Sequence, residues 1–193
     1  RDSFVFRVNA SYRKFKSGGS GFYGWNGLRY FLFEYEEELM KQRNQPKISW
    51  NYFIKSSKDK VSIEHIYPQT ATADCWEAMF VDVNQSMKKY YNGSLGNLLP
   101  LSSSINSSLQ NDCFDDKKKT KKDQNGNVVR SGYANGSYSE QEVSFETNWG
   151  PNEIQERGLK LLSFMESRWK INLGNNDQKK DLLHLVEKDK ILD

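Results

Sequence analysis

The sequence predicts an α+β fold, a mostly helical domain built around a small core of two strands and one helix. Three observations lead to this prediction. Apolar residues recur at helical spacing over residues 28–39 and again over 154–169. Short apolar runs at 61–66 and 97–101 have the length of strands rather than of helices. Serines follow the second run and can cap a short helix.

The length of 193 residues is enough for one buried core and too short for two average domains. We therefore expect a single domain, residues 1–193. The chain begins at Arg1 rather than at a methionine, so we also expect it to be a piece of a longer protein. Four segments are predicted in order: a helical N-terminal part (1–47), the ββα core (48–122), a flexible flap (123–148) and C-terminal helices (149–193).

The N-terminal part contains an amphipathic helix over residues 28–39, for which Asn26 is an available cap. Its acidic residues Glu34 and Glu36–Glu38 are predicted to form a solvated face. A metal cluster is the less favoured alternative, because no histidine or aspartate shares their stripe.

The core begins with two predicted strands, 48–54 and 61–66, and Pro68 ends the second. A single helix is predicted over 76–90, closed by Asn92-Gly93, and it separates the second strand from the third at 97–101. A short helix carrying Asn106 follows.

The C-terminal half begins with a polar stretch, 115–139, in which Asn125-Gly126 is a hairpin-turn signal. A long helix is predicted from Pro151 to near Gly174. A short helical tail over 182–186 can follow.

The net charge of +3 is only mildly basic and does not by itself indicate a nucleic-acid partner. The local distribution is more informative, because lysines crowd into one short stretch that can follow a phosphate backbone. The alternative is an ordinary solvated loop. The lysines concerned are Lys117, Lys118, Lys119, Lys121 and Lys122.

The two cysteines, Cys75 and Cys113, lie far apart in sequence and outside any C-x-x-C pair. We therefore expect neither a disulfide framework nor a cysteine zinc site, and a reducing cytoplasm fits this pattern best. No segment approaches the roughly 18 uncharged apolar residues of a membrane span, and no signal peptide is visible.

A candidate active site combines His65, one of only two histidines, with Glu64, Asn97 and Asn106. Phosphodiester hydrolysis needs a neutral base to activate water and a cation to stabilise charge on the phosphate. An imidazole suits the base, and Glu64 and Asn106 offer the hard oxygen ligands that Mg²⁺ or Mn²⁺ accepts. Asn97 can fix the loop that contains His65 and the residues just after it, here called the histidine loop, by hydrogen bonding.

One geometric difficulty concerns Glu64 and His65, because adjacent residues on a regular strand point to opposite faces. Both can face one metal only if the strand bends between them, and Pro68 makes a bend plausible. His184 has no such companions and is predicted to be structural.

Three motifs carry a resemblance to known proteins: Ile63-Glu64-His65-Ile66-Tyr67-Pro68-Gln69, Leu95-Gly96-Asn97-Leu98 followed by Asn106, and Phe114 with Lys117 or Lys118. They resemble the HNH nuclease superfamily and, more narrowly, the C-terminal nuclease domain of GmrSD-type restriction proteins, including SspE-like anti-phage proteins. Flanking segments are also similar, so the resemblance extends over most of the chain. They are Leu28–Leu32 with Glu34 and Tyr35, and Trp149 with Ile154, Arg157 and Leu162.

The resemblance implies a ββα-metal (HNH) core and specific roles for the motif residues. His65 would be the general base, Asn97 would position its loop, and Asn106 would bind metal in place of the last histidine of HNH. Glu64 stands where an aspartate ligand is common, and the lysines at 117 and 118 would contact phosphate. The resemblance also implies an N-terminal ParB-like nucleotide-hydrolysing domain elsewhere in the parent protein, and a link to phosphorothioate-modified DNA.

The preferred hypothesis is a cytoplasmic DNA endonuclease or nickase, dependent on a divalent metal, that acts in anti-phage restriction. A second hypothesis is a catalytically degenerate HNH-like module that binds DNA without cutting it. A third, a helical interaction domain, leaves the ordered histidine and asparagines unexplained.

Overall fold

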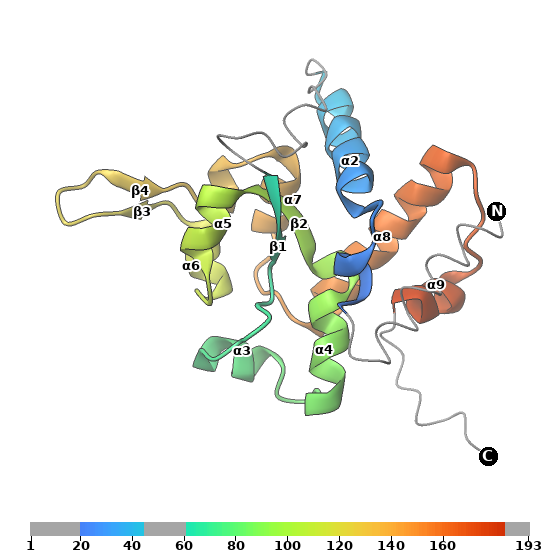
Figure 1. Cartoon of the computed structure of the whole chain (residues 1–193), viewed down its shortest axis with the longest axis horizontal. Coiled ribbons are helices and arrows are strands. Elements are labelled where there is room, and N and C mark those ends of the chain that lie inside the picture. The colour runs from blue at the N-terminus through green and yellow to red at the C-terminus, as the bar shows by residue number, and fades with distance from the viewer. Residues whose placement is uncertain (1–19, 45–60, 184–193) are drawn as a thin grey trace.

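The centre of the fold is an antiparallel pair of short strands, β1 (Val61–His65) and β2 (Leu98–Ser102). The computed structural model describes residues 20–44 and 61–183, and Figure 1 shows the strand pair surrounded by helices. In the register of the pair, Val61 lies opposite Ser102 and His65 lies opposite Leu98. The two strands predicted at 61–66 and 97–101 are therefore confirmed to within a residue or two, whereas the one at 48–54 lies outside the described residues.

Two short helices, α3 (Asp74–Met79) and α4 (Gln85–Gly93), occupy the excursion between β1 and β2. The prediction of one helix over 76–90 was wrong. Asn84 breaks it, because its side chain accepts a hydrogen bond from the backbone N–H of Ser86 and so caps a new helix. A 3-10 turn, η3 (Leu95–Asn97), then leads into β2.

A long helix, α8 (Pro151–Trp169), packs against η3 at very short range. A β-carbon on Gly96 would overlap the Ile154 carbonyl oxygen, so only glycine permits this approach. The buried Arg157 donates to the carbonyls of Gly96 (2.7 Å) and Leu98 (2.9 Å). The helix thereby fixes the backbone on which β2 begins, and its predicted start at Pro151 is confirmed.

The N-terminal helix α2 (Leu28–Gln42) lies alongside α8, with Phe31 packed against Phe164 and Trp169. A 3-10 turn, η1 (Gly21–Gly24), precedes α2. The helix was predicted, but its N-cap residue is Gly27 and not Asn26. The last described helix is α9 (Asn176–Leu183), which packs on α8. It starts earlier than the predicted tail, and His184 lies outside the described residues.

After β2 the chain forms α5 (Ser103–Leu109) and α6 (Phe114–Lys118), and then a hairpin that projects from the body in Figure 1. The hairpin strands are β3 (Lys121–Lys122) and β4 (Val128–Arg130), and Gly126 in its turn has a φ of +83°. The predicted hairpin turn is thus present.

The second half of the predicted flexible flap (123–148) forms regular secondary structure instead. It forms a 3-10 turn, η4 (Tyr133–Asn135), and a helix, α7 (Tyr138–Ser144), that packs on α2. The backbone N–H groups of Tyr138 (2.7 Å) and Ser139 (2.9 Å) donate to the carboxylate of Glu36. Glu36 is therefore a buried helix cap, and the prediction of a fully solvated acidic face on α2 was wrong.

Cys75 in α3 and Cys113 before α6 form a disulfide, contrary to the prediction from their sequence spacing. A separation of 38 residues gave no local signal, but folding brings the two Cα atoms to 6.0 Å. Disulfides are typical of oxidising compartments, so the cysteine argument for a cytoplasmic location no longer holds. The location itself stays a prediction.

Among the described helices, none combines the length and apolar character needed to cross a membrane.

We predict that reducing the disulfide lowers stability, because it removes a closed loop of 38 residues. For a loop of that length the loss in the free energy of unfolding is about 3–4 kcal/mol. Guanidinium denaturation with and without reductant measures it, and a Cys75→Ser, Cys113→Ser double variant is the control that reductant leaves unchanged. Equal midpoints for the oxidised and reduced native protein would rule out a stabilising bridge.

Candidate active site

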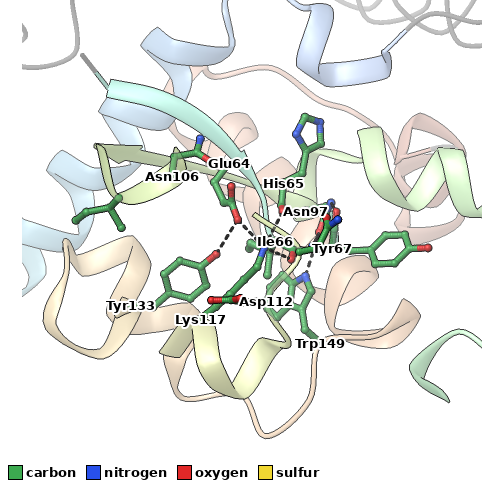
Figure 2. Close-up of polar contacts among 12 residues, drawn as sticks. Glu64, His65, Ile66, Tyr67, Asn97, Asn106, Asp112, Lys117, Tyr133 and Trp149 are labelled. Atoms are coloured by element: carbon green, nitrogen blue, oxygen red, sulfur yellow. Dashed lines mark hydrogen bonds and ion pairs between the residues drawn. The ribbon is translucent and has the colours of Figure 1, made fainter. Parts of the chain in front are cut away.

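His65 is the last residue of β1, and the strand stays regular through it. His65 pairs with Leu98, and the next residue still donates a ladder bond, from Ile66 N–H to the Asn97 carbonyl (3.0 Å). The expected bend between Glu64 and His65 is therefore absent. Figure 2 shows their side chains pointing in different directions, as strand alternation requires.

The His65 imidazole lies against the Tyr23 ring, with ring centroids 4.5 Å apart. The Gln69 amide nitrogen is 3.5 Å from the imidazole Nε2, at the outer limit of a hydrogen bond. Burial, and secondarily the Lys117 cation, lowers the pKa of His65 to about 4. The imidazole is consequently neutral at physiological pH, which is the form that can accept a proton.

Asn97 is fully buried and clamps the backbone just beyond His65. Its side-chain oxygen accepts from the Tyr67 N–H (2.7 Å) and from the Trp149 indole (3.1 Å). Its amide nitrogen donates to the carbonyls of Tyr67 (2.9 Å) and Asn92 (3.0 Å). Two of these four bonds hold the Tyr67 backbone just beyond His65, and the other two tie Asn97 to Trp149 and Asn92 (Figure 2).

Glu64 faces the other side of β1, where it forms a buried ion pair with Lys117. The Lys117 Nζ is 2.6 Å from the carboxylate, and it also donates to the carbonyls of His65 (3.3 Å) and Ile66 (3.0 Å). The Tyr133 hydroxyl (3.2 Å) donates to the same carboxylate oxygen. Burial raises the pKa of Glu64 and lowers the pKa of Lys117, and each partner's charge opposes that change.

Lys117 therefore cannot contact a phosphate, since its side chain is fully buried. The prediction that it binds DNA was wrong, because the lysine run does not lie on one exposed surface. Lys118 is half-buried, donates to the Glu146 carbonyl (3.0 Å) and pairs with Asp115. The exposed members of the run are Lys119, Lys121 and Lys122.

Asn106 lies on α5, and its amide donates to the Ser62 hydroxyl (2.8 Å). Ser62 and Glu64 are two residues apart on β1, so Asn106 and Glu64 share a face of the strand. His65 lies on the opposite face. The structure thus brings the two predicted metal ligands to one side and places the predicted base on the other.

As placed, these residues do not form a ready cation site. The Glu64 carboxylate is already neutralised by Lys117, and it also accepts from Tyr133 and from the His65 backbone. In the described part of the chain, no three histidine, cysteine, aspartate or glutamate side chains gather closely enough to hold a metal. A cation at Glu64 would share the carboxylate with the Lys117 ammonium, whose charge opposes it.

Comparison with known protein families gives a match over most of the chain. The family described as "GmrSD restriction endonucleases, C-terminal domain" matches residues 7–164 of the chain. The chain belongs to this family. Neither the curated proteins nor the solved structures contain a match.

Membership in the GmrSD C-terminal family identifies the chain as a nuclease domain of the restriction type. The matched segment contains β1, β2 and α5, and therefore every residue of the candidate site. It confirms the narrower of the two resemblances drawn from the sequence.

Sequence reasoning assigned no role to several residues that organise this GmrSD-type site. Tyr133 comes from η4, and Tyr23 comes from η1, and neither has a local motif that links it to β1. Gln69 could have been found, because it follows His65 by four residues within the first motif. Trp149 and Arg157 were noted only as flanking similarity, although both bond the segment around Asn97.

We predict that the Glu64 and Lys117 substitutions are strongly coupled. Lys117→Met or Glu64→Leu alone leaves an unpaired buried charge and costs about 3–5 kcal/mol of unfolding free energy. The double variant should lose much less than the sum of the two, as measured by chemical denaturation.

A matched control is the pair of Lys118 with the exposed Asp115, for which the expected coupling is below about 1 kcal/mol. If the losses at Glu64 and Lys117 were additive, so that their coupling energy were as small as that of the control pair, the result would contradict a buried ion pair.

Proposed function

We propose that this domain is a DNA endonuclease or nickase of the HNH type, in which His65 is the general base. Membership in a family of restriction endonucleases carries the proposal. The neutral state of the buried His65 and the two bonds of Asn97 to the Tyr67 backbone just beyond it support the assignment of roles.

In the proposed reaction a water oxygen attacks phosphorus while the imidazole of His65 takes the water proton. A phosphorus–oxygen bond forms to water, and the bond to the 3′ oxygen breaks. The leaving 3′ oxygen takes a proton from solvent. One such centre cuts one strand per event, so a double-strand break needs two nicks or two copies of the domain.

Dependence on Mg²⁺ or Mn²⁺ is part of the proposal. Glu64 and Asn106 share one face of β1, and Mg²⁺ commonly uses only one or two protein ligands together with water and substrate phosphate. The ion pair between Glu64 and Lys117 argues against a preformed site. The metal requirement therefore needs a test separate from that of the base.

The proposed partner is DNA, contacted by Lys118, Lys119, Lys121 and Lys122. The last two lie on β3 of the projecting hairpin, where their side chains are exposed. We further propose that a ParB-like nucleotide-hydrolysing domain of the parent protein licenses cleavage, in an SspE-like anti-phage system of the cytoplasm.

A second candidate is a domain that binds DNA without cutting it. The observation that favours it is the buried ion pair of Glu64 with Lys117, which neutralises the carboxylate that a metal would need. It predicts salt-sensitive DNA binding without any strand breaks.

We predict that the chain nicks supercoiled plasmid in Mg²⁺ or Mn²⁺ and that excess chelator abolishes nicking. His65→Ala should lower the rate by about 100-fold or more, because a general base typically contributes that factor. The matched control is His184→Ala, which replaces the only other histidine and should nick at the wild-type rate. Gel separation of supercoiled, nicked and linear plasmid measures each of these reactions.

Two results would decide against parts of this proposal. Nicking that persists unchanged in His65→Ala would remove His65 as the base. Intact plasmid after confirmed folding and DNA binding would favour the non-cutting module.

A further inference from the structure

A pocket of about 370 Å³ lies in the excursion between β1 and β2, beside the His65 loop. Its wall is formed by the loop after β1, by α3 and by α4. The volume falls in the range of small-molecule sites. Neither the family match nor the reaction proposed above gives this pocket a role.

The aromatic part of the pocket lining is rigid. Tyr67 and Trp76 are both buried, and their ring centroids are 5.7 Å apart in an edge-on contact. Tyr67 also stacks on Phe80 at 4.0 Å. Because Asn97 and Asn92 bond the Tyr67 backbone, this lining is tied to the same clamp that holds His65.

The polar part of the lining consists of amides and lysines. Gln69, Gln85 and Asn92 each carry a carbonyl acceptor and an amide donor, and the Asn92 amide is oriented by its bond to the Tyr67 carbonyl (3.0 Å). Lys88 and Lys89 contribute positive charge, and Glu77 is the acidic group among the lining residues. Amides suit the mixed donor and acceptor edge of a nucleobase, and lysines suit the phosphates beside it.

Gln69 connects the pocket to the candidate base. It lines the pocket, and its amide nitrogen is 3.5 Å from His65 Nε2. A ligand in the pocket would therefore lie one side chain away from the reacting phosphate. This proximity to the proposed general base His65 favours a nucleotide of the substrate strand over a free nucleotide, because binding of a free nucleotide does not require a position beside His65.

We propose that this pocket receives an unpaired nucleotide of the DNA strand being cut, adjacent to the scissile phosphate. The inference rests on the proposed nuclease function and adds a binding site to it. Enzymes that read a base outside the helical stack hold it between aromatic side chains and hydrogen-bond its edge. The lining of this pocket supplies an aromatic wall, formed by Tyr67 and Trp76, and amide groups for the edge of the base.

The test measures binding without cleavage. The probe is a DNA duplex with one unpaired 2-aminopurine, whose fluorescence rises when the base leaves the stack, and chelator is present throughout. Ala71→Trp fills the pocket, and the pair Gln85→Ala with Lys88→Ala removes two polar contacts from it. The matched control is Gln155→Ala with Lys180→Ala on α8 and α9, outside the pocket lining.

The wild type and the control pair should both raise the fluorescence with the same Kd. Both pocket variants, with unchanged circular dichroism and Tm, should bind about tenfold more weakly and lose the fluorescence rise. This outcome supports the pocket even if the domain never cuts plasmid.

Two outcomes would overturn the inference. One is wild-type fluorescence and Kd in both pocket variants, which would leave the nuclease proposal intact if His65-dependent nicking persists. The other is pocket-dependent binding of a free deoxynucleoside monophosphate with no fluorescence change from the duplex probe, which would assign the pocket to a free nucleotide.

Discussion

The rest of the site depends on the contacts of one buried group, the ammonium of Lys117. It binds oxygen atoms of three consecutive residues, the Glu64 carboxylate and the carbonyls of His65 and Ile66. A buried cation is costly unless it is fully paired, so these oxygens must stay where they are. The end of β1 is therefore fixed by electrostatics as well as by the strand ladder, and the same charge disfavours protonation of His65.

A second set of contacts holds the chain after β1 against the body of the protein. Asn97 joins the Tyr67 backbone to Trp149, and Arg157 binds the carbonyls on either side of Asn97. These bonds link the loop after β1 to η3 and α8, segments that lie far apart in sequence. The histidine loop is consequently held from both sides, by Lys117 on one and by Asn97 on the other (Figure 2).

The parts of the fold that could be predicted are those with local signals. Helical spacing found α2 and α8, and the ordered motifs found His65 and Asn97 together. The parts that were missed depend on partners distant in sequence. Lys117 lies 53 residues from Glu64, and a lysine run usually indicates a solvated surface. The contact by which Glu36 caps the first N–H groups of α7 spans 102 residues, so it had no local signal either.

The central claim is that burial and the Lys117 cation keep the His65 imidazole neutral, and NMR titration of the labelled imidazole tests it most directly. A His184→Gln background leaves His65 as the only signal. The account predicts a neutral imidazole from about pH 8 to about pH 5, with protonation at a pKa of about 4 that rises in Lys117→Met. Titration near the ordinary value of 6.5, unchanged in Lys117→Met, would contradict it.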